Sequence, residues 1–76
     1  METNAIGLHV KYFDMMGCET YGYIVAVEES HDPEVPYLYI MNEDSEIESH
    51  EDFVNGQNVT YTDIRPSTEV IIDNWL

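Results

Sequence analysis

The side chains of this sequence with the clearest capacity for chemistry are its carboxylates. Ten of the sixteen Asp and Glu residues lie between residues 28 and 52, and neither basic residue, Lys11 or Arg65, lies there. Carboxylates bind cations, either metal ions or the lysine and arginine side chains of another protein. The segment is therefore the electrostatic centre of the chain.

Three of these carboxylates occupy alternate positions, at Asp44, Glu46 and Glu48. If the segment is extended, they project from one face about 6.8 Å apart, because each strand residue rises ~3.4 Å. Successive phosphates on one DNA strand advance by ~3.4 Å of axial rise and wind around the helix, so their spatial separation is of the same order. The row of carboxylates is therefore predicted to imitate a stretch of the DNA backbone. The alternative is a solvated edge strand that its acids protect from aggregation.

We predict a partner-binding surface made of the acids of this segment and two tyrosines beside them. Aromatic anchors commonly dominate interface energy, and Tyr37 and Tyr39 share a strand face and adjoin both acidic clusters. The alternative for the tyrosines is core and cross-strand packing. The predicted partner-binding residues are Glu28, Glu29, Asp32, Glu34, Tyr37, Tyr39, Glu43, Asp44, Glu46, Glu48, Glu51 and Asp52.

Metal binding and catalysis find less support in the sequence. An EF-hand calcium loop needs Gly at its sixth position, and the acidic segment has no glycine. His9, His31 and His50 lie far apart and have no nearby His or Cys partner of the kind a zinc site requires. Cys18 and His9 could form a nucleophile and base, but no third orienting group is indicated. We therefore predict no metal, no cofactor and no enzymatic activity.

Length and composition predict one acidic domain over residues 1–76. A net charge of -14 repels nucleic acid and anionic membranes and attracts basic proteins. The single cysteine excludes an intramolecular disulfide and suits a reducing cytosol. No signal-peptide pattern is present, and the apolar runs are far shorter than the ~20 residues of a membrane span. The expected location is the cytoplasm.

Short strands must position these residues. Alternation places Leu8, Val10 and Tyr12 on one face of a strand over 8–13. A second strand is predicted over 20–27, with Gly22 as a bulge or bend and with one shared face for Tyr21, Tyr23, Val25 and Val27.

The remaining chain predicts further short elements. Residues 28–36 are expected as an exposed hairpin loop, and a third strand covers 37–41. A short, mostly solvated strand is predicted over 45–49, followed by one helical turn or connector over 50–54. Asn55-Gly56 is the strongest turn signal. A strand over 58–64 and a last strand over 69–76 complete the chain, with a short terminal helix as the alternative for the last segment.

These elements predict a mainly β protein: a small twisted antiparallel sheet or a partly open SH3-like barrel of five to six short strands. Over residues 7–64 the chain resembles an SH3-like barrel in the spacing of its glycines and apolar residues. The spacing is seen at Gly7, Val10 and Tyr12 and again at Gly22, Ile24 and Val27. The resemblance carries no function across, because a fold does not imply a function.

In size and charge the chain also resembles the small acidic proteins that phages and mobile elements use against host restriction, CRISPR, repair or transcription machinery. The resemblance implies an inhibitor that occupies the basic surface of a nucleic-acid-binding protein, as a DNA mimic or a plug, in the cytoplasm of a host cell. It implies no direct contact with nucleic acid or membrane.

Two other functions stay open. An immunity protein, antitoxin or permanent-complex subunit would bind one basic protein without mimicry. A protein of a saline cytoplasm would use its charge for hydration alone. Monomer and homodimer are both compatible with the sequence.

Overall fold

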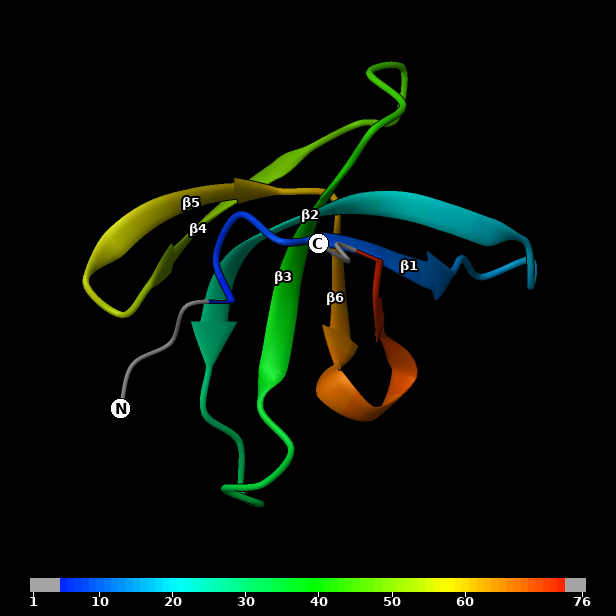
Figure 1. Cartoon of the computed structure of the whole chain (residues 1–76). Helices are drawn as coiled ribbons and strands as arrows, with labels where there is room; N and C mark the ends of the chain where they lie inside the picture. Colours follow the sequence, from blue (N-terminus) through cyan, green and yellow to red (C-terminus); the bar gives the residue numbers. More distant parts are fainter. Residues whose placement is uncertain (1–4, 74–76) are drawn as a thin grey trace.

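The computed structural model describes residues 5–73 and shows a mainly β fold of two antiparallel sheets (Figure 1). Five strands form the larger sheet in the order β6-β3-β2-β1-β7, and a β4–β5 hairpin forms the smaller one. The predicted fold class is confirmed, and the sheet does not close into a barrel. The strands are β1 His9–Phe13, β2 Glu19–Glu28, β3 Tyr37–Asn42, β4 His50–Val54, β5 Gln57–Tyr61, β6 Asp63–Pro66 and β7 Ile71–Ile72.

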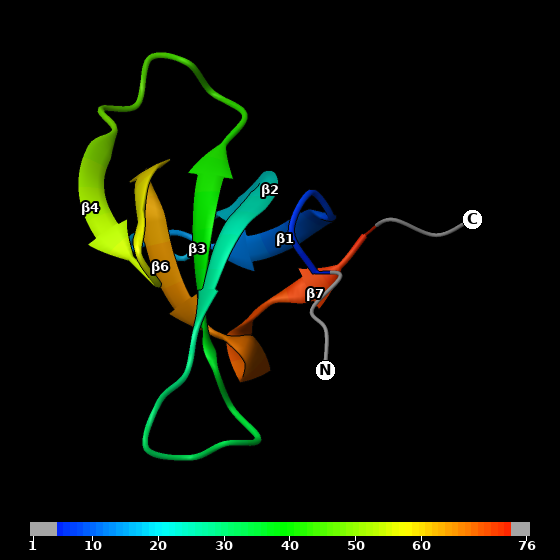
Figure 2. The same cartoon turned by 90° about the vertical axis from the view of Figure 1, so that its left-hand side faces the viewer.

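Strand β2 connects the halves of the larger sheet because it is long enough to pair with two neighbours. Its first half pairs with β1, from Phe13 opposite Glu19 to His9 opposite Tyr23. Its pairing with β3 runs from Gly22 opposite Asn42 to Glu28 opposite Tyr37. Figures 1 and 2 show β2 curving as it passes from one neighbour to the other.

A β-bulge in β2 inverts the alternation of its side chains. Ile24 pairs with Ile40 and Ala26 pairs with Tyr39, which leaves Val25 as an extra residue. An extra residue reverses which face the following side chains occupy. Val27 therefore returns to the face of Ile24 and packs against the main core, and the predicted shared face of Tyr21, Tyr23, Val25 and Val27 is wrong at Val27.

Gly22 is required by a close approach of strands, and the bulge predicted there lies at Val25 instead. A β-carbon at Gly22 would lie 2.4 Å from the carbonyl oxygen of Met41 and 2.8 Å from Cγ2 of Ile40. Only glycine allows β2 and β3 to pack this closely.

The apolar residues form two cores on opposite faces of the larger sheet. The main core contains Val10, Tyr12, Ile24, Leu38 and Ile40, as the alternation of the first strand predicted. The second core lies between β2, β3 and the β4–β5 hairpin, which covers one end of the sheet (Figure 2), and it contains Ala26, Tyr39, Val54 and Val59.

The β4–β5 hairpin confirms one prediction and corrects another. Asn55 and Gly56 have φ angles of 53° and 81°, as a two-residue type I′ turn requires. Residues 50–54, predicted as a helical turn or connector, form strand β4, of which only Val54 is buried. Pairing with β5 fixes this strand, because its own sequence is mostly polar.

The predicted strand over 58–64 is broken at Thr62, where the chain passes from the hairpin into the larger sheet. The Thr62 amide donates to the carbonyl of Ile40 at 2.8 Å, and the Thr62 hydroxyl accepts from the Asn42 amide at 2.8 Å. These bonds replace ladder bonds at the crossing.

The C-terminal segment contains a 3-10 helical turn, η1 at Ser67–Glu69, and then β7, which pairs with β1. The predicted last strand is thus present at Ile71–Ile72, and residues 74–76 lie outside the described residues.

Candidate partner-binding surface

The acidic segment does not form one surface, because β3 divides it. The first acidic loop, residues 29–36, joins β2 to β3, and the second acidic loop, residues 43–49, joins β3 to β4. The two loops lie at opposite ends of β3 in both views (Figures 1 and 2). Six strand residues at ~3.3 Å each separate the loops by about 20 Å. The structure therefore brings the predicted acids together as two groups.

The carboxylate row predicted at Asp44, Glu46 and Glu48 is absent, because the second acidic loop is a turn. The Asp44 side chain accepts from the Glu46 amide at 3.0 Å, and the Asp44 carbonyl accepts from the Ile47 amide at 3.1 Å. The Asn42 side chain accepts from the Asp44 amide at 2.7 Å. Asn and Asp side chains that bond the backbone two residues ahead favour turns over strands.

The first acidic loop is built in the same way, as its composition predicted. The Asp32 side chain accepts from the Glu34 amide at 3.0 Å, and the Asp32 carbonyl accepts from the Val35 amide at 2.9 Å. Glu29, Asp32 and Glu34 are all exposed. Each loop thus holds its carboxylates on a hydrogen-bonded turn.

Two of the predicted acids, Glu28 of β2 and Asp52 of β4, act on the hydroxyl of Tyr39. That hydroxyl donates to Glu28 Oε1 at 2.8 Å. Burial, the hydrogen bond to Glu28 and the charges of Glu28 and Asp52 raise the pKa of Tyr39 to about 12. Glu51 and Asp52 are exposed on β4, and Glu28 is half-buried at the end of β2.

The two predicted aromatic anchors have different places. Tyr37 is exposed at the start of β3, next to the first acidic loop. Tyr39 is only 5% exposed, and its ring packs edge-on against Tyr61 in the second core. Tyr39 therefore lies in the core rather than at the surface where it was predicted, because β3 is covered on both faces.

Both basic side chains of the sequence contact other groups of the chain. Lys11 Nζ lies 3.4 Å from Glu19 on the neighbouring strand. The Arg65 guanidinium donates to the carbonyl of Phe13 at 3.1 and 3.3 Å and lies 5.3 Å from the centre of the Tyr12 ring. The residue counts alone did not indicate these contacts, which depend on the pairing of β1 with β2 and on the approach of Arg65 to the end of β1. The outward charge of the described surface is consequently acidic.

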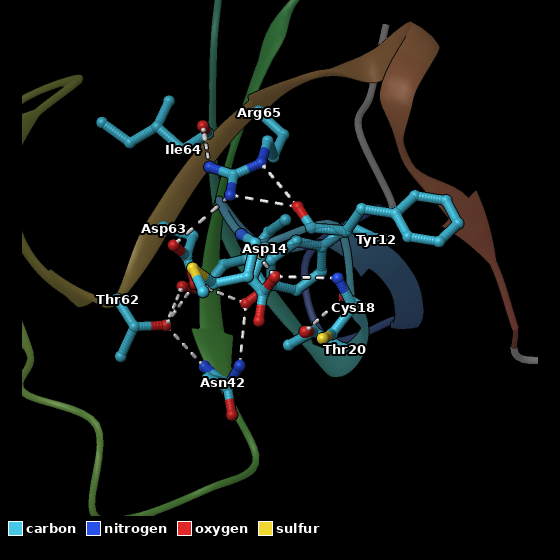
Figure 3. Close-up of polar contacts among 12 residues, drawn as sticks. Tyr12, Asp14, Cys18, Thr20, Asn42, Thr62, Asp63, Ile64 and Arg65 are labelled. Atoms are coloured by element: carbon cyan, nitrogen blue, oxygen red, sulfur yellow. Dashed lines mark hydrogen bonds and ion pairs between the residues drawn. The ribbon is translucent and has the colours of Figure 1, made fainter.

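A polar network at the end of the main core fixes Asp63 (Figure 3). The Tyr12 hydroxyl donates to Asp63 Oδ2 at 2.5 Å and accepts from the Asn42 side chain at 3.0 Å. Burial, and next the hydrogen bond to Asp63, raise the pKa of Tyr12 to about 12. The sequence analysis missed this network because its members come from three separate strands, β1, β3 and β6.

The histidines and the cysteine do not gather into one site. His9 contacts Glu43 and Asp73 through its two ring nitrogens and stacks on Tyr21 with ring centres 5.6 Å apart. Cys18, His31 and His50 are exposed. Within residues 5–73, no three His, Cys, Asp or Glu side chains are arranged to hold a metal ion.

Comparison with protein-family models, curated proteins and solved structures found no match to this chain. In the described part of the chain, no helix has the length and apolar character needed to cross a membrane.

Proposed function

We propose that this chain is an acidic interaction protein without catalytic activity, which covers the basic, nucleic-acid-binding surface of a partner protein in the cytoplasm. One observation carries the proposal: the only two basic side chains are engaged within the fold, while the acids at residues 28–52 are exposed except for the half-buried Glu28. Such a surface attracts a basic protein and steers its approach.

Covering the basic surface has more support than imitation of DNA. Imitation was inferred from an extended carboxylate row, and the second acidic loop forms a turn instead. Two acidic loops about 20 Å apart fit two separated basic sites on a partner or the two sides of one groove. The charge alone then blocks the partner from nucleic acid.

The test uses the immobilised chain and two loop variants in a cytoplasmic lysate, washed at low and high salt. One variant carries Glu29→Gln, Asp32→Asn and Glu34→Gln, and the other carries Asp44→Asn, Glu46→Gln and Glu48→Gln. Asn keeps the acceptor oxygen that holds each turn, so the variants remove charge and preserve the loops. Captured proteins are identified by mass spectrometry and then purified.

We expect a nucleic-acid-binding protein that duplex DNA displaces from the chain. Each variant should slow its association roughly 3- to 10-fold at low salt and leave dissociation nearly unchanged, because exposed charges act mainly on association. Capture of no basic protein would contradict the proposal and favour a role of the charge in hydration alone.

A second candidate is the subunit of a permanent complex, which a separate observation favours. Met15, Met16 and Phe53 are 94%, 85% and 68% exposed, and apolar side chains at such exposure are available for contact with another protein. This candidate predicts a partner that both variants retain equally well at high salt.

A further inference from the structure

A hollow of about 250 Å³ lies between the β1–β2 turn and the second acidic loop. Its apolar rim consists of Met15 and Met16 from the turn and Ile47 from the loop. Carboxylates of Asp14 and Asp63 line the same hollow. A hollow with this lining offers an apolar surface and negative charge to the same occupant.

The methionines are exposed on a turn that is already ordered. The Asp14 side chain accepts from the amides of Met16 and Cys18, both at 2.9 Å, and Gly17 takes a φ of 82°. Methionine adapts its shape to many partners, and a preformed turn lowers the entropy lost on binding. The turn therefore presents the two side chains without further ordering of its backbone.

The carboxylates of the hollow are also fixed in place. Asp63 is held by the Tyr12 hydroxyl, and its Oδ1 lies 3.7 Å from the guanidinium of Arg65 (Figure 3). Asp14 uses Oδ1 to bond the turn, and among the described residues no group donates to its Oδ2. Asp14 can thus accept a hydrogen bond from an incoming group.

Further negative charge flanks Ile47, one of the rim residues. Ile47 stands between Glu46 and Glu48 in the second acidic loop, and both carboxylates are exposed. An uncharged apolar occupant would gain nothing from these groups, whereas a cationic one would gain from all of them. Charge complementarity therefore selects among the occupants that fit the apolar rim.

We propose that this hollow receives a lysine or arginine side chain of the basic partner, and the proposal rests on the proposed function. The aliphatic part of that side chain packs on Met15, Met16 and Ile47, as the stems of long cationic side chains do on apolar surfaces. Its charged end meets Asp14 at the wall of the hollow. The hollow would thus be the point where the acidic surface gains a specific, partly apolar contact.

The test is a titration of the protein, labelled with ¹³C at its methionine methyl groups, with an acetylated and amidated hexa-arginine peptide. The control probe is the same peptide with citrulline, which keeps the shape of arginine and lacks its charge. We expect the methyl signals of Met15 and Met16 to shift and saturate with hexa-arginine and to stay in place with hexa-citrulline.

Three variants extend the test. Asp14→Asn keeps the acceptor that holds the turn and removes the charge, and Met15→Ser with Met16→Ser removes the rim. Each should weaken hexa-arginine binding roughly fivefold, the scale of an exposed ion pair or a small apolar contact. Phe53→Ser is the matched control, because Phe53 is exposed on β4 and does not line the hollow.

The outcomes separate this inference from the proposed function. Hexa-arginine could bind without moving the Met15 and Met16 signals and with the same affinity for the variants. That result would overturn the proposal for the hollow and leave the acidic surface as the binding site. Equal shifts with hexa-citrulline would also overturn it, because charge would then not select the occupant. Absence of any hexa-arginine binding at low salt would overturn both.

Discussion

The two buried tyrosines predict a loss of stability at alkaline pH that can be assigned to individual residues. Tyr12 is fully buried and Tyr39 is 5% exposed, and the pKa of each is raised to about 12. In the unfolded chain a tyrosine ionises near pH 10. Between these values the unfolded state has released a proton that the folded state keeps, so rising pH favours unfolding.

The size of the effect follows from the pKa difference. Each pKa unit corresponds to about 1.36 kcal/mol, so each tyrosine loses ~1.4 kcal/mol by pH 11 and ~2.7 kcal/mol above pH 12. Below pH 10 both states are neutral and the contribution is constant. The total stability of a domain of 76 residues is about 4 to 11 kcal/mol. The pH-dependent part is therefore large enough to measure.

The assay compares the wild type with Tyr39→Phe by urea unfolding at pH 8 and pH 11, followed by circular dichroism. At pH 8 the variant should lose about 1 kcal/mol, because it lacks the bond from the Tyr39 hydroxyl to Glu28. Between pH 8 and pH 11 it should lose ~1.4 kcal/mol less than the wild type. Tyr12→Phe is less suitable, because it would also leave the buried Asn42 side chain without its partner.

Other groups that titrate in this range cancel in the difference between the two proteins, since both contain them. Equal losses between pH 8 and pH 11 in the wild type and in Tyr39→Phe would refute the argument. The second core would then not hold the Tyr39 hydroxyl in its neutral form.

Three further predictions concern the fold and its charge. Gly22→Ala should lower the free energy of unfolding by about 1–3 kcal/mol in urea titrations, because its β-carbon would collide with the backbone of β3; an unchanged urea midpoint would show that the strands can separate freely. Asn55→Ala should cost about 1–2 kcal/mol by the same measurement, since it places a side chain without an amide at a φ of 53° and removes the bond from Asn55 to the carbonyl of Val27; Asn55→Gly, which relieves the strain alone, should recover part of the loss. Raising NaCl from about 0.02 to 0.5 M should raise the thermal midpoint, because screening weakens the repulsion within a chain of net charge -14; a midpoint independent of salt would contradict this account.

The features of the fold that local pattern determines were predictable from the sequence. Val10 and Tyr12 alternate with His9 and Lys11 and belong to the main core as expected. Asn55-Gly56 forms the predicted turn because both residues tolerate a positive φ. In each case the neighbouring residues alone carry the physical cause.

The features that depend on pairing partners were not predictable. Strand β4 is mostly polar, and only its partner β5 makes it a strand. The alternation around Ile47 suggested a strand, but Asn42 and Asp44 bond the local backbone and no neighbouring strand competes with those bonds. The bulge at Val25 is a shift in the register between β2 and β3, which the pattern of a single strand does not reveal.

The sequence analysis predicted that the acids of the candidate surface are exposed, but it did not predict how they are arranged. The acids of both loops lie at the surface as expected. Their separation was implied by the predicted strand over 37–41, because a strand that runs between two loops keeps them at its opposite ends. Met15 and Met16 were not among the predicted partner-binding residues, although the turn that contains them, residues 14–17, was predictable from the sequence.

The bulge at Val25 has a consequence for how much change in length β2 tolerates. Without the bulge but with Val25 in place, Ile24 and Ala26 would share one face of β2. Because Val25 is an extra residue, Ile24 and Val27 face the main core and Ala26 faces the second core. Removal of Val25 would abolish the bulge and leave Ala26 facing the second core and Val27 facing the main core, because Ala26 would then directly follow Ile24, just as Tyr39 directly neighbours Ile40 in β3. We therefore expect β2 to tolerate the loss of a residue at this one point, whereas an insertion after Ala26 would move Val27 to the face of the second core.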